Sequence, residues 1–146
     1  MTILSGRCHC GGVEVSFETA QSPQAIEVRA CRCTFCRRHG AKTVTDADGR
    51  LVISAQAGTL NRYRFGLRTA DFLLCRHCGV YIAAIIADGG EERATLNVAG
   101  TMIEGLWDRA ATPIDLDHED AATRRVRRQR SWTPATVVSH VARRSG

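Results

Sequence analysis

Seven cysteines are the residues of this sequence whose type and spacing best support chemistry. They form a C-x-C pair, a C-x-C-x-x-C trio and a C-x-x-C pair, which are Cys8 and Cys10, then Cys31, Cys33 and Cys36, then Cys75 and Cys78. Cysteines so close in sequence make poor disulfides, and an odd number argues against a disulfide framework. Thiolates at these spacings are preferred ligands of Zn²⁺. We therefore expect the cysteines to bind two zinc ions per chain.

Two divisions of the cysteines into metal sites fit the spacing. In one, the two pairs form a closed four-thiolate site, and Cys31, Cys33 and Cys36 form a second site with an open position. In the other, Cys33 and Cys36 join the C-x-x-C pair in a zinc ribbon, and Cys31 joins the C-x-C pair. A closed site is structural, whereas an open position is typical of catalytic zinc. An acidic side chain or a histidine can also close the trio; the histidines are His9, His39, His77 and His118.

Strand patterns dominate the first hundred residues and must position these cysteines. Residues 13–18 alternate between apolar and polar side chains, as in a strand with one buried face, and residues 26–30 alternate in the same way up to Cys31. Glycines separate the runs, and only a short helical turn is expected, after Cys36. We expect further strands in 51–54, 60–65, 71–74, 80–86 and 94–98.

The C-terminal residues differ in composition from the rest. An acidic stretch, 115–120, precedes a basic one, 124–130, and Thr133 followed by Pro134 favours the start of a short helix. Val137, Val138 and Val141 would lie on one face of that helix. We therefore expect a zinc-binding domain over 1–120 and a basic tail over 121–146 that is loosely docked or mobile.

Charge and hydropathy exclude some classes of protein. The formal net charge is +5, but seven thiolates and two Zn²⁺ would lower it to about +2. No run of interleaved basic and aromatic residues is present, so nucleic-acid binding is not expected. The longest apolar run, 80–87, is too short to cross a bilayer, and no signal-peptide pattern opens the sequence. We expect a cytoplasmic protein that does not bind membranes.

Three motifs give the sequence a family resemblance. GRCHCGGV at 6–13, CRCTFCRRHG at 31–40 and LCRHCG at 74–79 make the chain similar, over about residues 3–100, to the glutathione-dependent formaldehyde-activating enzyme family. All seven cysteines occur in the family's order. Thr34 stands where serine is frequent in the family, and Arg76 and His77 replace a frequent proline, but neither change removes a ligand.

This resemblance implies a fold, a division of the cysteines and an activity. The fold is mainly β, organised by zinc into several small antiparallel sheets in a tent-like arrangement. The two cysteine pairs would hold a structural zinc, and Cys31, Cys33 and Cys36 a functional zinc that takes part in catalysis. The family's activity joins glutathione to formaldehyde and gives S-hydroxymethylglutathione, which is formally a carbon–sulfur lyase reaction run in reverse. The implied partners are therefore a small thiol and a small aldehyde.

Cations close to the trio fit such a substrate. Glutathione carries two carboxylates, and an arginine can bind a carboxylate through two hydrogen bonds. Arg37 and Arg38 directly follow Cys36, so we expect them, ahead of Lys42, to bind the substrate. His39 is a candidate proton shuttle for the nascent alkoxide and equally a polar turn residue.

Two other functions fit parts of the sequence. Related proteins such as centromere protein V are non-enzymatic, and this chain can likewise be a binding module with two structural zincs, with 124–130 contacting an acidic partner. The plainer interpretation of this basic run is that it neutralises 115–120. A redox or metal-buffering role for Cys33 and Cys36 is the third hypothesis, although no β-α-β pattern surrounds them. The sequence assigns no oligomeric state.

Overall fold

The computed structural model describes residues 1–87 and 90–140, and within them the chain is mainly β, as predicted. The strands are β1 (Thr2–Arg7), β2 (Val13–Thr19), β3 (Arg29–Cys31), β4 (Thr43–Val44), β5 (Arg50–Gln56), β6 (Leu60–Tyr63), β7 (Asp71–Cys75), β8 (Tyr81–Ile86), β9 (Arg93–Asn97), β10 (Thr112–Ile114) and β11 (Thr133–His140). The helices are α1 (Thr34–His39), α2 (Ala121–Ser131) and a 3₁₀ turn at Pro23–Ala25.

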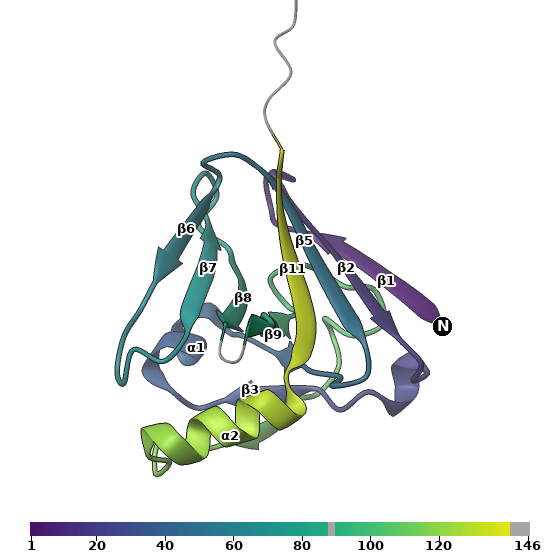
Figure 1. Ribbon diagram of the computed structural model, residues 1–146. Coiled ribbons are helices and arrows are strands. Elements are labelled where there is room, and N and C mark those ends of the chain that lie inside the picture. Colours follow the sequence, from purple (N-terminus) through teal and green to yellow (C-terminus); the bar gives the residue numbers. More distant parts are fainter. Residues whose placement is uncertain (88–89, 141–146) are drawn as a thin grey trace, which may run out of the picture.

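These strands form one connected sheet that bends into a tent (Figure 1). Its strand order is β1-β2-β5-β11-β9-β4-β3-β10, and β8, β7 and β6 continue in turn from β9. One wall of the tent holds β6 and β7, the other holds β11, β5, β2 and β1, and α2 lies beneath them near β3 (Figure 1). Most pairings are antiparallel, but β5–β11 and β3–β10 are parallel, so the small sheets expected from the sequence are joined into one mixed sheet.

Alternation of apolar and polar residues places β2 and β5 as expected. Val15 and Phe17 are buried and pair with Ile53 and Leu51 of β5, while the intervening side chains are less buried or exposed. Burying each such side chain contributes about 1.5–3 kcal/mol. Strand β8 differs, because all six of its residues are buried, and it therefore lies at the centre of the core between β7 and β9.

The C-terminal segment corrects the sequence-based expectation. Residues 121–131 form α2, and Asp120 caps it by accepting a 2.7 Å hydrogen bond from the backbone N–H of Thr123. Thr133 and Pro134 start strand β11 rather than a helix. The prediction of a loosely docked or mobile tail, with a helix beginning at Thr133, is therefore wrong for 121–140, and Val141 lies outside the described residues.

Long-range pairing explains this difference. Strand β11 fills the position between β5 and β9, where it pairs in parallel with β5 from Ala135↔Leu51 onward. Unpaired strand edges leave backbone donors and acceptors without partners, so pairing outweighs the local signal of a Thr-Pro helix start. The hydroxyl of Thr133 is buried and accepts a hydrogen bond of 2.9 Å from the backbone N–H of Asp46, which anchors the start of the strand.

Short or exposed elements make up the remaining differences. Strands β1, β4 and β10 were not expected, and α1 begins at Thr34, before Cys36. Strand β1 has no fully buried residue, yet it pairs with β2 over its whole length. Among the described residues, no helix has both the length and the apolar character that crossing a bilayer would need.

Candidate functional site

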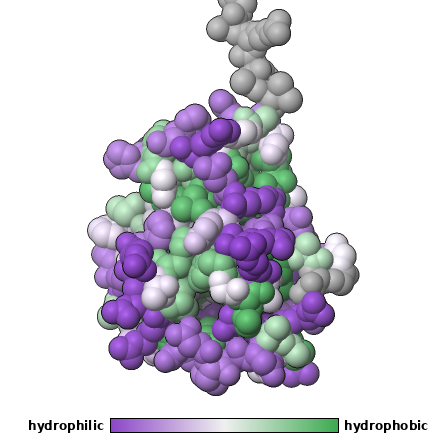
Figure 2. Space-filling model, turned by 90° about the vertical axis from the view of Figure 1, so that its left-hand side faces the viewer, coloured by the Kyte–Doolittle hydropathy of each residue, from purple (hydrophilic) through white to green (hydrophobic). Residues whose placement is uncertain are grey.

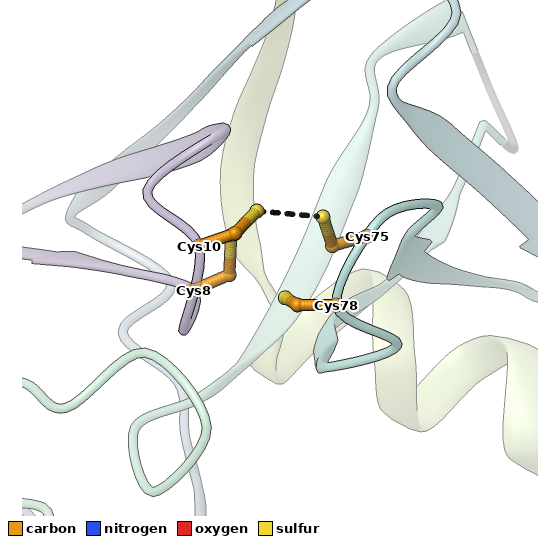
Figure 3. A group of neighbouring side chains, drawn as sticks. All are labelled: Cys8, Cys10, Cys75 and Cys78. Carbon is orange, nitrogen blue, oxygen red and sulfur yellow. Dashed lines mark hydrogen bonds between the residues drawn. The ribbon is translucent and has the colours of Figure 1, made fainter.

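Four thiols from the two cysteine pairs meet between the walls of the tent (Figure 3). Cys8 and Cys10 lie in the turn after β1, Cys75 ends β7, and Cys78 lies in the following turn. The Sγ atoms of Cys8 and Cys10 are 3.7 Å apart, and those of Cys10 and Cys75 are 3.6 Å apart. A zinc ion with Zn–S bonds of about 2.3 Å needs tetrahedron edges of about 3.8 Å. The four-thiol cluster therefore fits a closed zinc site.

Backbone donors and turns support the four-thiol cluster. The N–H of Val13 donates to Sγ of Cys8 at 3.3 Å, and the N–H of Gly12 donates to Sγ of Cys10 at 3.4 Å. Burial is the largest influence on Cys78 and opposes its ionisation, but hydrogen bonds to the backbone and to neighbouring thiols outweigh it and lower its pKa to about 6. Burial raises the pKa of Cys75. A cation at the centre of the cluster would favour the ionised form of all four thiols.

Cys31, Cys33 and Cys36 form a second cluster, the trio, in which every pair of Sγ atoms lies within 4.8 Å. Cys31 ends β3, Cys33 is the N-cap of α1, and Cys36 lies within α1. Sγ of Cys33 accepts a hydrogen bond of 3.3 Å from the N–H of Cys36, so the helix start fixes the spacing of two thiols. The cysteines are thus grouped as in the first of the two divisions, and within 1–87 and 90–140 no histidine or acidic side chain joins the trio.

Thiols of the trio compete for a single negative charge. Hydrogen bonds from Cys31 and then from Cys36 lower the pKa of Cys33 to about 2. Hydrogen bonds with Cys31 and then with Cys33 raise the pKa of Cys36, and the bond with Cys33 raises that of Cys31. A bound divalent cation would remove this competition, because it allows neighbouring thiolates to coexist. Three thiolates leave one position of a zinc tetrahedron open.

A cavity of about 460 Å³ lies over the trio and is lined by all three of its cysteines. Its apolar wall includes Phe72 and Trp132, of which Trp132 is buried. On the side of the molecule that carries β6 and α1, apolar side chains are exposed among hydrophilic ones, with a hollow in the lower half (Figure 2). The cavity is within the size range of small-molecule sites, so the trio faces a space that a substrate can enter.

Tyr81 is the polar aromatic residue of this cavity, and the sequence analysis did not single it out. Its side chain is 1% exposed, and it lines the cavity together with the trio. Burial raises the pKa of its hydroxyl, and negative charge on the trio raises it further. The hydroxyl therefore stays protonated and can donate a hydrogen bond to a negative oxygen that develops beside it.

An aromatic cluster holds α1 against the wall that contains β7. The ring of Phe35 lies 4.8 Å from that of Phe72 and 5.0 Å from that of Tyr81, both in edge-to-face geometry. The ring of His39 lies 4.6 Å from that of Phe35, between centroids, in a tilted arrangement. His39 is exposed and does not line the cavity, so the geometry favours the interpretation of a polar turn residue over that of a proton shuttle.

Arg37 and Arg38 lie outside this cavity. Both are exposed, and the Nη1 atom of Arg38 donates to the backbone oxygen of Thr34 at 3.1 Å. Arg37 lines a different and shallower hollow of about 330 Å³, which also touches Cys31 and Cys36. Substrate binding by these two arginines stays a prediction, for which Arg37 is the better placed of the pair.

The arginines that do line the cavity are Arg29, Arg124, Arg127 and Arg128. Three of them come from α2, which the sequence analysis treated as a tail. Residues 124, 127, 128 and 132 are spaced three and four apart, so they share one side of a helix that begins after Asp120. The cap at Asp120 was the signal that could have revealed this helix and its cavity-facing side.

Comparison with known proteins places these features in a family. A model of the family described as "Glutathione-dependent formaldehyde-activating enzyme" matches residues 3–114. The chain is also similar to a crystal structure of a Rhodobacter sphaeroides protein, with 37% identity and a TM-score of 0.54. That similarity covers 75% of this chain and 97% of the other. A search of curated proteins found no match.

Proposed function

Because the chain belongs to the glutathione-dependent formaldehyde-activating enzyme family, we propose that it joins the thiol of glutathione to formaldehyde or another small aldehyde in the cavity over Cys31, Cys33 and Cys36. The observation that carries this proposal is the position of the trio. Its three thiols are one ligand short of a tetrahedron and face a cavity of about 460 Å³, whereas the four-thiol cluster is complete in itself.

Zinc is the cofactor that fits both clusters. Bound at the trio, Zn²⁺ would supply one open coordination position and favour the deprotonated form of a thiol placed there. Bound at the four-thiol cluster, it would link the turn after β1 to the turn after β7 and so hold the walls of the tent together. We assign a functional role to the trio and a structural role to the four-thiol cluster. Cys33 is the ligand of the trio that the experiment below replaces.

The reaction needs a nucleophilic sulfur and a proton for oxygen. The substrate thiol gives up its proton and the resulting thiolate attacks the aldehyde carbon. A carbon–sulfur bond forms, the π electrons of the carbonyl move to its oxygen, and that oxygen takes one proton, which balances the one that the thiol lost. Tyr81 lines the same cavity, and its hydroxyl is the hydrogen-bond donor that we assign to this oxygen. Apolar walls that include Phe72 and Trp132 exclude water from the reacting atoms.

A reducing compartment suits this chemistry. All seven cysteines are free thiols, and thiol ligands must stay reduced to bind metal. Glutathione is also most useful as a substrate where it is reduced. We therefore place the protein in the cytoplasm as part of the same proposal, as a carbon–sulfur lyase of the S-hydroxymethylglutathione synthase type.

The test compares turnover with metal coordination. Zinc-loaded protein should accelerate the exchange between formaldehyde, glutathione and S-hydroxymethylglutathione, followed by NMR exchange spectroscopy. Cys33→Ser should abolish this acceleration, whereas Arg130→Gln, on an exposed position of α2, should leave it unchanged. Zinc-edge absorption should show one more sulfur ligand per chain when glutathione is added. No acceleration together with no spectral change at millimolar glutathione would refute the proposal and leave a binding module with two structural zincs.

A further inference from the structure

The wall of the cavity formed by α2 carries positive charge that the protein does not fully neutralise. Four arginines and two acidic residues, Asp117 and Glu119, line the cavity, which gives the lining a net charge of +2 before the trio is counted. Helix α2 lies outside residues 3–114, so the family match assigns nothing to it. Its arginines therefore need an explanation from this chain's own geometry.

Glu119 neutralises one of the three arginines that α2 contributes to the cavity. Its carboxylate accepts hydrogen bonds from Nε of Arg127 at 2.9 Å and from Nη2 at 2.9 Å, so this pair is bidentate. Nε of Arg124 lies 3.6 Å from the same carboxylate, which is too long for a hydrogen bond, and this buried nitrogen has no hydrogen-bond partner. Arg127 is thus paired with this carboxylate through two hydrogen bonds, whereas Arg124 lies only at ion-pair distance from it and donates from Nη2 to the backbone oxygen of Leu116 at 2.9 Å.

Arg128 is the least compensated of the three. It is 7% exposed, and its buried Nε has no hydrogen-bond partner. Its guanidinium donates to the hydroxyl of Thr69 at 2.8 Å and lies 4.7 Å from the ring centroid of Trp132. Within the described part of the chain, no carboxylate lies within ion-pair distance of this guanidinium. Burial lowers its pKa to about 10, the charges of Arg124 and Arg127 lower it further, and the charge of Glu119 opposes this shift.

A buried guanidinium with a free donor is costly unless an anion completes it. We propose that Arg124 and Arg128 form a carboxylate-binding subsite in the cavity, so that α2 selects substrates with a carboxylate group. Planar guanidinium donors match the two oxygens of a carboxylate, and Trp132 supports the guanidinium of Arg128 from one face. The subsite adds a substrate-binding element to the proposed function. Its role in catalysis rests on that function, because the subsite would orient the acidic thiol substrate over the trio.

The experiment uses three probes on the zinc-loaded full chain, measured by isothermal titration calorimetry. Glutathione offers thiol and carboxylates, its diethyl ester lacks the carboxylates, and S-methylglutathione lacks the thiol. In the unmodified protein the diester should bind about tenfold more weakly than glutathione, as expected for loss of a charged hydrogen bond. In Arg128→Gln this ratio should fall to about one, and in Arg124→Gln it should fall partway. Arg130→Gln is the matched control and should keep the full ratio, because Arg130 is exposed and does not line the cavity.

The outcomes separate this inference from the proposed function. If the ratio of glutathione to diester affinity is near one in the unmodified protein, or is unchanged in both Arg128→Gln and Arg124→Gln, the carboxylate subsite is wrong. Failure of all three probes to bind at millimolar concentration also overturns it. If S-methylglutathione binds as tightly as glutathione while the arginine-dependent ratio persists, the subsite stands and the thiol chemistry at the trio fails. Because Arg128 is buried, Arg124→Gln decides the question if Arg128→Gln does not fold.

Discussion

The two cysteine clusters should differ in how much they stabilise the fold, and Cys10→Ser and Cys33→Ser form a matched pair for measuring it. Cys10 is exposed, so serine there removes a ligand without burying a hydroxyl group. Cys33 is the N-cap of α1, a position that serine also favours, so the helix start is preserved. Neither substitution creates a large cavity. The difference in stability between the variants therefore reports the metal links themselves.

Chain entropy sets the expected magnitude. If Cys10→Ser releases the ion of the four-thiol cluster, the link across 65 residues between the two cysteine pairs is lost, and this link contributes about 4 kcal/mol in the cross-link model. If Cys33→Ser releases the ion of the trio, the lost link spans at most the five residues from Cys31 to Cys36 and contributes about 2 kcal/mol. Both clusters bind through thiolates, so the metal–sulfur energies largely cancel in the comparison. Against a total stability of about 5–15 kcal/mol, loss of the longer link is severe.

Calorimetry of zinc-loaded variants measures this difference. Cys10→Ser should lower Tm by roughly 10 °C and Cys33→Ser by roughly 5 °C, and zinc analysis should show reduced occupancy in both. Only Cys33→Ser should abolish turnover at temperatures where both variants are folded. If Cys33→Ser destabilises the protein as much as Cys10→Ser, the division into a structural and a functional cluster is incorrect.

Three further predictions concern single side chains. Tyr81→Phe should lower kcat about 10²-fold with little change in KM or Tm, since it removes one donor to the developing oxyanion; steady-state kinetics would contradict this if KM alone changed. Arg37→Ala should raise KM for glutathione by up to about tenfold if a carboxylate reaches the shallow hollow beside Cys31, and an unchanged KM would remove Arg37 from the site. Glu119→Gln should destabilise the fold by about 1–2 kcal/mol at pH 7, because the hydrogen bond from Arg127 holds the pKa of Glu119 below the ordinary 4.5. That stabilisation is fully present above pH 4.5 and disappears as pH falls through the lowered folded-state pKa, so equal denaturation midpoints of the two proteins at pH 7 would disprove it.

Local patterns in the sequence were sufficient for the elements that bury one face. The alternation in residues 13–18 predicts a strand with one buried face, the continuous apolar run around β8 predicts a strand buried on both faces, and both strands form as expected. The grouping of the cysteines was also within reach, because each group occupies one turn, although spacing alone left two divisions open. In the folded structure the two cysteine pairs lie together, although 65 residues of chain separate Cys10 from Cys75.

Features that depend on distant partners could not be predicted in this way. Helix α2 has almost no apolar stripe, since arginines occupy the side that faces the cavity, and its order comes from the Asp120 cap and the contacts of Arg127 and Arg128. Strand β11 forms because β5 and β9 leave a gap between them, and no local signal encodes that gap. The Asp120 cap could have indicated α2, but the position of this helix against the trio, and with it the charge of the cavity wall, depends on these distant contacts.

The insertion of β11 between β5 and β9 also has a consequence for biosynthesis. Leu51 of β5 pairs with Ala135 of β11, so the sheet cannot close until residues 133–140 have left the ribosome. Until then two strand edges stay open to pairing with other nascent chains, and the late closure of such distant contacts slows folding. Truncating the chain within β11 should therefore reduce the yield of soluble protein, although such a truncation removes none of the cysteines.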